Sequence, residues 1–513
     1  MDGRYPLRLL SSNSYLRLAE KRGVAKGDRM TGKQAMDDVL VIIPGITGSI
    51  LTKRGHTIWG PVPQSIIGYI ESLFDPAGPW SLDDLRVVDD DPEADDLGDG
   101  IQASGLVPYT LVPGLDCFDG YTGLTSQLRN TFDLRVGDVA SEGPPANYFE
   151  FPYDWRRDNR ASARRLKRLV DRELPKWRKF RDYPDAKLIL IGHSMGGLLA
   201  RYYVECLEGF KDTRAIITFG TPHRGSVKTI DYLVNGYRSL GLRLATFTEL
   251  MRSFRSVYQL LPIYECVLEN SQSANPVWRR VAEITLPKVN QIWAQEALDF
   301  YRQIEKGHEA NKTLDEYDVR LLPVIGWGHT TLQSAKNLGH SVEVGTELPP
   351  AVDKVLTDGD GTVPRVSAIP IELHHKTEQW WPWNQKHATI QNNETLLGNI
   401  TQILSVLQGR LGQPARGPGA TPEPNKIDLN LEDAYLSSEP VLIRVTATTT
   451  PEPRAVMAEI APLAKGGQLR TISLKSEGNV WTCAELFAAG AYRVKVRLEG
   501  VNIEPVTDVF EVA

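Results

Sequence analysis

A serine stands between glycines in the segment LIGHSMGGLLARYY, at residues 190–203. Gly192, Ser194 and Gly196 fit the G-x-S-x-G pattern, in which a sharp turn between a strand and a helix holds a serine hydroxyl above the edge of a sheet. An apolar run precedes the pattern, and apolar residues at helical spacing follow it. This context favours a nucleophilic serine over an ordinary glycine-rich turn.

A serine nucleophile needs a base and an acid, and hydrolases with this turn carry them in the order serine, acid, histidine. The segment VLTDGDGTVPRVS, after an apolar run at 319–326, offers Asp358 and Asp360 as the acid. The same segment does not fit a calcium loop. Thr362 occupies the third ligand position, and Val363 stands where the turn requires glycine.

Three histidines follow the acid in the chain and are candidates for the base. His374 and His375 end the alternating run IPIELHH, which the pattern predicts as a strand. His387 comes later, in WWPWNQKHATI, before a predicted helix. Because the base of such hydrolases lies on the loop after the last strand, the order favours His387.

Acyl transfer also needs hydrogen-bond donors for the oxyanion of the intermediate. One donor is expected from the backbone of Met195, directly after the serine. The second is expected from Ile46, in the loop PGITGS after the apolar run 38–45. This loop is not a phosphate loop, because no Gly-Lys-Ser/Thr follows it.

Buried strand patterns alternate with helical patterns along the first 400 residues or so, which predicts a doubly wound, mostly parallel sheet. The interval 226–316 is too long for a loop between neighbouring strands and predicts an inserted helical cap. After the Pro/Gly-rich segment QPARGPGATPEPNK, short alternating strands predict an all-β, immunoglobulin-like sandwich. The predicted parts are an N-terminal extension (1–37), an α/β domain (38–408) with a lid insertion (52–112) and the cap, a linker (409–425) and the sandwich (426–513).

The chain has 513 residues and a formal net charge of −6, which gives no reason to expect nucleic acid as a partner. Its basic run, from Arg156 to Arg181, is interleaved with acidic and apolar residues and predicts the solvated face of a surface helix. The acidic segment DDDPEADDLGDG, at 89–100, is expected to form an exposed loop.

The opening segment MDGRYPLRLLSSNSYLRLAEKRG lacks an apolar core of signal-peptide length, and no apolar run is long enough to span a bilayer. We therefore expect a cytoplasmic protein. Cys117, Cys206, Cys266 and Cys483 match no zinc spacing and are expected to be free thiols.

Several motifs in order resemble the lecithin:cholesterol acyltransferase family of α/β-hydrolases, from about Asp38 to Gln408. They are VLVIIPGITGSIL, TIW, YDWR, GHSMGG, FGTPHRGS and DGDGTVP, followed by a histidine near the last helix of the domain. The family includes lysosomal phospholipases and phospholipid:diacylglycerol acyltransferases. The resemblance implies Ser194 as nucleophile, Asp360 as orienting acid, His387 as base, and Ile46 and Met195 as the oxyanion hole.

The resemblance also places Trp59 where the family carries a tryptophan on a mobile lid that meets the acyl chain or the lipid surface. Packing in the core is the equal alternative for this side chain. Two features depart from the family. The lid insertion lacks a cysteine pair, and the C-terminal sandwich has no counterpart.

These observations predict a serine-dependent acyl hydrolase or acyltransferase that acts on lipid esters, at a membrane surface, without a metal or other cofactor. An esterase of small soluble esters and an interaction scaffold with a hydrolase fold are the alternatives. The sandwich is a candidate surface for a protein partner. The sequence does not choose between water and an alcohol as the acyl acceptor, or between lipids.

Overall fold

The computed structural model describes residues 32–60, 82–108, 110–112, 115–239, 242–243, 245–269, 275–409, 425–463 and 467–512. Most of the predicted N-terminal extension, residues 61–81 of the predicted lid insertion and most of the predicted linker lie outside these ranges. Within them, no helix is both long and apolar enough to span a bilayer.

A six-stranded sheet, parallel throughout, forms the centre of the larger domain. The chain runs from β2 to β9 on one side and then returns to place β10 on the other side of β2. Such a reversal opens a crevice at the carboxyl ends of the strands, where α/β proteins bind their ligands. In spatial order the strands are β19 (Trp381–Trp383), β16 (Arg320–Gly326), β11 (Thr213–Phe219), β10 (Leu188–His193), β2 (Val39–Ile43) and β9 (Tyr148–Glu150).

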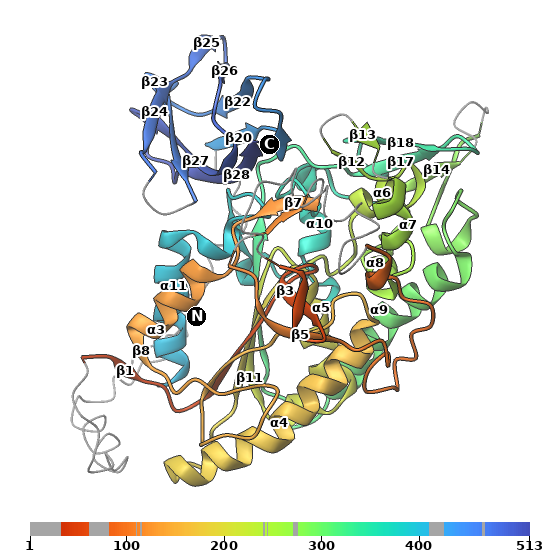
Figure 1. Cartoon of the computed structure of the whole chain (residues 1–513), viewed down its shortest axis with the longest axis vertical. Helices are drawn as coiled ribbons and strands as arrows, with labels where there is room; N and C mark the ends of the chain where they lie inside the picture. Colours follow the sequence, from red (N-terminus) through yellow and green to blue (C-terminus); the bar gives the residue numbers. More distant parts are fainter. Residues whose placement is uncertain are drawn as a thin grey trace, which may run out of the picture.

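Helices cover both faces of this sheet, because alternate residues of each buried strand point into two separate cores. On β2, for example, Val41 belongs to one core and Ile42 to the other. The first core lies under α4 (Asn159–Arg181), α5 (Met195–Cys206) and α9 (Gln291–Asn311); the second lies under α3 (Thr122–Thr131) and α11 (Glu394–Leu407) (Figure 1). The predicted doubly wound fold is confirmed.

The cap differs from the expected helical insertion. Its longest helix, α9, packs against α5 and connects β11 to β16, so it is a crossover helix of the main sheet. The rest combines short helices with a four-stranded sheet whose last two strands come from beyond residue 316. These elements are α6 (Val227–Val234), α7 (Ala245–Met251), α8 (Arg255–Tyr258), β14 (Val267–Glu269), β15 (Val277–Arg279), β17 (Ser334–Asn337) and β18 (Val342–Gly345).

Smaller sheets flank the main one. A three-stranded sheet joins β3 (Ser49–Lys53), β4 (His56–Trp59) and β5 (Ile101–Leu106) within the predicted lid insertion. Two-stranded pairs join β1 (Gln34–Ala35) with β8 (Phe132–Asp133), β6 (Thr110–Val112) with β7 (Leu115–Phe118), and β12 (Arg238–Ser239) with β13 (Leu242–Arg243). A short helix, α10 (Arg365–Ala368), follows the acidic motif DGDG.

The predicted strand IPIELHH is wrong. Its residues Ile371–Leu373 form one turn of 3₁₀ helix after Pro370, with Leu373 buried and Ile371 47% exposed. The last strand of the sheet is instead β19, at Trp381–Trp383. Because β19 lies at the sheet edge, with β16 as its one partner in the described part of the chain, it tolerates Pro382, which has no backbone N–H to donate.

The C-terminal region is an antiparallel sandwich, except for one short parallel pair, and it confirms the predicted all-β domain. Alternating residues of its strands are buried, as in Val441, Ile443 and Val445 of β22. One sheet has β20 (Lys426–Asn430), β22 (Val441–Thr448), β26 (Val480–Glu485) and β25 (Lys475–Glu477). The other has β21 (Ala434–Tyr435), β28 (Val506–Val512), β27 (Gly490–Glu499), β23 (Ala455–Pro462) and β24 (Arg470–Ser473).

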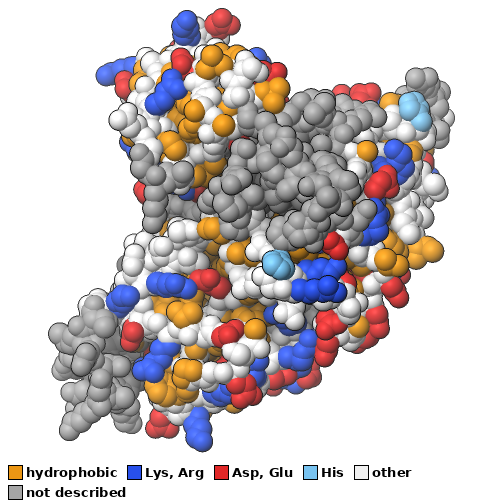
Figure 2. Space-filling model, in the orientation of Figure 1, with side chains coloured by type: hydrophobic (Ala, Val, Ile, Leu, Met, Phe, Trp, Pro, Cys, Tyr) orange, Lys and Arg blue, Asp and Glu red, His pale blue; other side chains and the backbone are white. Residues whose placement is uncertain are grey.

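The sandwich sits at one end of the molecule, with β20 and β28 nearest the larger domain (Figure 1). On the face drawn in Figure 2, basic and acidic side chains are interspersed rather than gathered by sign. Helix α4 carries most of the basic run with Leu166, Val170 and Leu174 buried, as the spacing predicted. Cys206, Cys266 and Cys483 are free, and the Cys117 side chain lies outside the described part of the chain.

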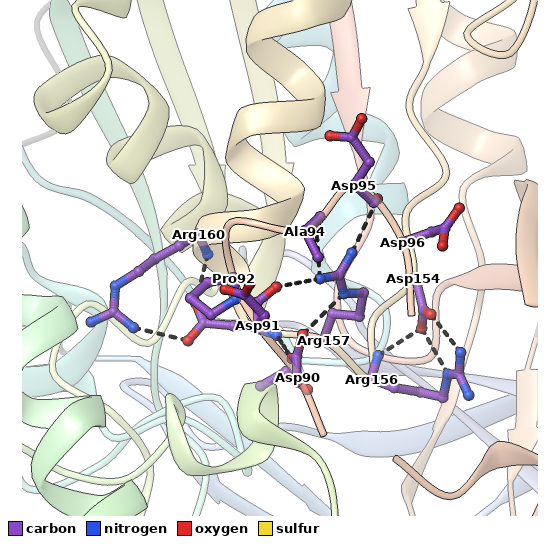
Figure 3. Close-up of polar contacts among 12 residues, drawn as sticks. Asp90, Asp91, Pro92, Ala94, Asp95, Asp96, Asp154, Arg156, Arg157 and Arg160 are labelled. Carbon is purple, nitrogen blue, oxygen red and sulfur yellow. Dashed lines mark hydrogen bonds and ion pairs between the residues drawn. The ribbon is translucent and has the colours of Figure 1, made fainter. Parts of the chain in front are cut away.

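Two arginines at the start of the basic run do not lie on a solvated face. Arg156 is fully buried and pairs with Asp154, and Arg157 is 5% exposed and pairs with Asp90. The acidic segment wraps around the Arg157 guanidinium, which donates to three backbone carbonyls of the segment as well as to Asp90 (Figure 3). The loop expected to be exposed is therefore anchored to the domain through its backbone.

Candidate active site

Ser194 lies at the turn between β10 and α5, with φ 51° and ψ −126°. Non-glycine residues rarely adopt a positive φ, and the conformation is held here by close packing of the neighbouring glycines. A Cβ atom on Gly196 would lie 2.4 Å from the carbonyl oxygen of Pro44, and one on Gly192 would lie 2.7 Å from Gly197. A side chain at either glycine of the motif would therefore clash with backbone atoms, so both positions require glycine.

The structure brings Ser194, His387 and Asp360 into one hydrogen-bonded chain. The Ser194 hydroxyl lies 3.0 Å from His387 Nε2, and His387 Nδ1 lies 2.7 Å from Asp360 Oδ2. With Nδ1–H donating to the carboxylate, Nε2 is left to accept the serine proton. Ser194 and His387 are 7% and 8% exposed and Asp360 is 1% exposed, so the charge of the carboxylate lies in a largely dry site.

Backbone amides hold the Asp360 carboxylate in place. The second oxygen, Oδ1, accepts hydrogen bonds from the amides of Thr362 (3.0 Å) and Val363 (2.6 Å), and the His387 amide donates to the Asp360 carbonyl (2.9 Å). The other candidate acid, Asp358, lies 3.8 Å from Arg365 rather than beside a histidine of the site. Burial raises the pKa of Asp358, and Arg365 lowers it in part.

The two other candidate histidines lie elsewhere. His374 Nδ1 accepts from the Arg224 guanidinium at 3.2 Å, and the rings of His374 and His375 are in edge contact, 4.7 Å apart. Burial, with Arg224 nearby, lowers the pKa of His374. Neither ring joins the chain that ends at Ser194.

The predicted oxyanion residues flank the serine. Ile46 is half-buried in a turn closed by a hydrogen bond from the Gly48 amide to the Gly45 carbonyl, and Thr47 adopts φ 62°. This turn lies against the nucleophile, since a Cβ on Gly45 would be 2.9 Å from Ser194 Cβ. Met195 is the first residue of α5, where backbone amides have no partner within the helix and the helix dipole favours negative charge.

Trp59 does not lie on an exposed lid. Its ring is 2% exposed, packs against Trp155 at 4.8 Å between centroids, and donates from Nε1 to the Thr47 carbonyl at 2.9 Å. The side chain therefore supports the turn that carries Ile46. Core packing, the alternative to the lid prediction, is what the structure shows, because the ring is buried against Trp155 and its indole N–H has an acceptor within this turn.

The YDWR motif supports the same loop through two further hydrogen bonds. The Tyr153 hydroxyl donates to the Pro44 carbonyl at 3.0 Å, and the Trp155 indole donates to the Ser49 carbonyl at 3.2 Å. Both aromatic side chains are buried. These two hydrogen bonds join residues 109 and 106 positions apart, so the sequence alone did not predict them.

Sequence reasoning missed Tyr121 and His193, which link the predicted oxyanion loop to the histidine loop. The Gly45 amide donates to the Tyr121 hydroxyl (2.6 Å), which lies 3.2 Å from His193 Nδ1. His193 Nε2 lies 3.1 Å from the His387 carbonyl. Burial holds the pKa of His193 well below its usual range, so the ring is neutral; Tyr121 donates to Nδ1, and Nε2–H donates to His387.

A pocket opens over Ser194 and His387, at the crevice where the strand order reverses. Its wall includes Ile46 from the loop after β2 and a set of apolar side chains from the cap. The cap contributes Tyr232, Met251, Val257 and Leu260, and Lys228 adds a cationic side chain. An apolar wall beside a nucleophile suits a substrate with a hydrocarbon part.

Among solved structures, two forms of a Bacillus licheniformis lipase, BlEst2, are similar to this chain. The propeptide form has 10% identity, covers 94% of each chain and has a TM-score of 0.30. The mature form has 12% identity, covers 73% of this chain and 96% of its own, and has a TM-score of 0.31. Phospholipase PlaB from Legionella pneumophila has 10% identity, 76% and 87% coverage, and a TM-score of 0.26. Scores this low carry no argument about the fold, and the α/β assignment of this chain rests on its own sheet topology.

A comparison with curated proteins finds no match. The family described as lecithin:cholesterol acyltransferase matches residues 121–342, a segment that contains Ser194, Met195 and the motifs YDWR, GHSMGG and FGTPHRGS. Asp360 and His387 lie beyond the match, and the structure brings them to the serine. Over residues 121–342 the chain is similar to the lecithin:cholesterol acyltransferase family, which confirms the resemblance predicted from its motifs.

Proposed function

We propose that this protein is a serine-dependent acyl hydrolase or acyltransferase of lipid esters. The observation that carries the proposal is the hydrogen-bonded chain from Ser194 through His387 to Asp360, at the floor of a largely apolar pocket. The family match supports the coarser class, an ester hydrolase or acyltransferase.

In the proposed reaction, Ser194 Oγ attacks the carbonyl carbon of an ester while His387 Nε2 takes the hydroxyl proton. Asp360 stabilises the imidazolium. The amides of Ile46 and Met195 donate to the oxyanion of the tetrahedral intermediate. His387 then gives its proton to the departing alcohol oxygen, which leaves an acyl-enzyme. Water or a second alcohol repeats the sequence in reverse and releases the acyl group.

The Ser194→Ala variant tests the proposal. Its release of fatty acid from phospholipid vesicles should fall to near background, because the hydroxyl that forms the acyl-enzyme is gone. Ser141→Ala, which changes an exposed serine on a surface loop, serves as the matched control and should keep full activity. Fatty-acid release that is unchanged in Ser194→Ala would refute the assignment.

The acyl acceptor and the lipid are open to direct measurement. Vesicles with and without diacylglycerol or a sterol separate transfer from hydrolysis, since transfer yields a new ester in place of free fatty acid. Rapid turnover of short-chain nitrophenyl esters, with none of vesicles, would favour the esterase of small soluble esters. A folded protein whose Ser194 does not react with a fluorophosphonate would favour the scaffold.

The membrane surface as the place of action and the cytoplasm as the compartment remain predictions from the sequence. So does a protein partner for the sandwich. The same fluorophosphonate probe, applied to intact cells and to separated membranes, would locate the active protein.

A further inference from the structure

The C-terminal sandwich contacts the larger domain at the loop that carries His387. Asn384, 8% exposed, begins this contact. Its side-chain amide donates to the carbonyl of Ile427 in β20 (2.9 Å) and accepts from the amide of the same residue (2.9 Å). The amide nitrogen also donates to the Trp327 carbonyl, after β16 (3.0 Å). One side chain thus ties β20 to the sheet edge beside the site.

Gln385 repeats this pattern with the other sheet of the sandwich. Its side chain is fully buried, donates from Nε2 to the Pro505 carbonyl (2.6 Å), and accepts at Oε1 from the Thr507 amide (3.4 Å). The partners are the backbone carbonyl of Pro505, just before β28, and the backbone amide of Thr507, within it. Because the backbone atoms of a strand are fixed by the sheet, these bonds fix the Gln385 side chain against the sandwich.

The next residues of the loop continue the contact. Lys386 Nζ lies 3.5 Å from the Asp508 carboxylate, and the Thr389 hydroxyl donates to the Thr507 carbonyl at 2.6 Å. Ala388 packs against Val509 in a small apolar cluster. Asn384, Gln385, Lys386, Ala388 and Thr389 therefore all contact the sandwich through their side chains.

His387 stands in the middle of this run and points the other way, to Ser194 and Asp360. The loop leaves β19, an edge strand of three residues whose one partner among the described strands is β16, so the main sheet holds its start through one short ladder. A base must be fixed to within a fraction of an ångström, and a misplacement of about 1 Å can cost ~10²-fold in rate.

We infer that the C-terminal sandwich positions the base of the site, with Gln385 and Thr389 as the positioning residues that transmit its hold to His387. The inference rests on the proposed function, since it concerns the same histidine. It gives the sandwich a part in acyl transfer that requires no further partner. The side chains that act belong to the loop 384–389, and their hydrogen-bond partners are backbone groups of Pro505 and Thr507.

The test compares full-length variants by steady-state hydrolysis of nitrophenyl butyrate and by the rate of fluorophosphonate labelling at Ser194. Gln385→Leu replaces the amide by an apolar side chain of comparable size and removes both hydrogen bonds to the backbone of residues 505–507. We expect its kcat to fall about 10- to 100-fold, with KM within about twofold of wild type, because the base is displaced while the pocket wall is unchanged.

A matched pair at Thr389 separates the hydroxyl from its packing. Thr389→Val keeps the shape of the side chain, loses the bond to Thr507, and should lower kcat in the same sense. Thr389→Ser keeps the hydroxyl and should retain the wild-type kcat. This pair decides the question if Gln385→Leu does not fold.

Thr395→Val is the control at the same domain interface. Its hydroxyl donates to Glu504 at 3.0 Å from α11, away from the histidine loop, so kcat should not change. Equal kcat in all variants would overturn the inference while leaving the proposed function in place, provided that wild type reacts with the probe. A loss in Thr395→Val as large as in Gln385→Leu would also overturn it, because the effect would then be general loosening. A folded wild type without reaction at Ser194 would overturn both proposals.

Discussion

Ser194 and its two partners could be predicted because the serine and the acid lie in recognisable motifs and the histidine must follow them in the chain. The G-x-S-x-G turn marks the serine, and the order serine, acid, histidine then leaves few candidates. Asp360 was separated from Asp358 only by the resemblance, and the geometry now gives a physical reason: the amides of Thr362 and Val363 hold its carboxylate toward His387.

The polar chain through Tyr121 and His193 could not be predicted, because its links join residues 72 to 194 positions apart. His193 lies inside the recognised motif, but its type says nothing of what its ring contacts. For Trp59, too, the sequence did not reveal which groups the side chain contacts. The family resemblance places Trp59 on a lid. Its indole instead donates to the Thr47 carbonyl, in a turn whose geometry cannot be predicted from the sequence pattern.

We predict that Tyr121→Phe lowers kcat about 10-fold with little change in KM. Phenylalanine keeps the packing of the ring, but Gly45 loses its acceptor and His193 Nδ1 loses this donor. The loss of a buried partner costs about 1–3 kcal/mol, and 1.4 kcal/mol corresponds to about 10-fold in rate. Steady-state kinetics with nitrophenyl butyrate measures the effect. Thermal melting serves as a check on folding, and an unchanged kcat in a folded variant would show that the link does not matter for the reaction.

At the scale of elements, the strands of the main sheet were predictable because they are buried on both faces and read as continuous apolar runs. β19 escaped notice. Its three residues are Trp-Pro-Trp, and the more regular pattern of Ile371 and Leu373 competed with it. Alternation alone could not reveal that Pro370 starts a 3₁₀ turn there, or that an edge strand accepts a proline.

The acidic loop at 89–100 gives a prediction at this scale. In Arg157→Ala the Asp90 carboxylate stays buried without its guanidinium, and the free energy of unfolding should fall by about 3 kcal/mol or more. Burial already raises the pKa of Asp90, although the Asp158 amide and Arg157 lower it in part. Urea denaturation measures the loss, and limited proteolysis should show earlier cleavage within the loop.

The control for this change is an arginine of α4 that contacts the same loop. Arg164 pairs with Glu93, whose side chain is 69% exposed, so solvent screens the pair. Arg164→Ala should therefore change the free energy of unfolding by less than about 1 kcal/mol. Equal stability of the two arginine variants would show that the buried pair of Arg157 and Asp90 contributes no more than an exposed pair.

At the scale of the whole molecule, the stability of the contact between the two domains should depend on pH. Asp428 of β20 accepts from Thr330 of the larger domain (2.7 Å between Oγ1 and a carboxylate oxygen) and lies 3.5 Å from His329 Nδ1. Burial alone would raise the pKa of Asp428, but hydrogen bonds from His329 and Thr330 lower it to about 2. Burial also lowers the pKa of His329.

Since the folded protein holds Asp428 below its ordinary pKa of 3.8, its contribution to stability is present above about pH 4 and is lost as the pH falls toward 2. Asp428→Asn should therefore melt at a lower temperature than wild type at pH 6, and the gap should close as the pH approaches 2. Scanning fluorimetry across this range measures both curves. A constant gap at all pH values would show that the charge of Asp428 has no part in the docking of the sandwich.

The contacts between the loop 384–389 and β28 can form only late in the synthesis of the chain. Gln385 and Pro505 are 120 positions apart, so a ribosome has exposed the serine, the acid and the histidine long before it releases the strand that steadies them. A nascent chain at that stage contains Ser194, Asp360 and His387 but lacks the contacts between the sandwich and the histidine loop. Synthesis would then delay full activity of the site until the C-terminal sandwich has folded.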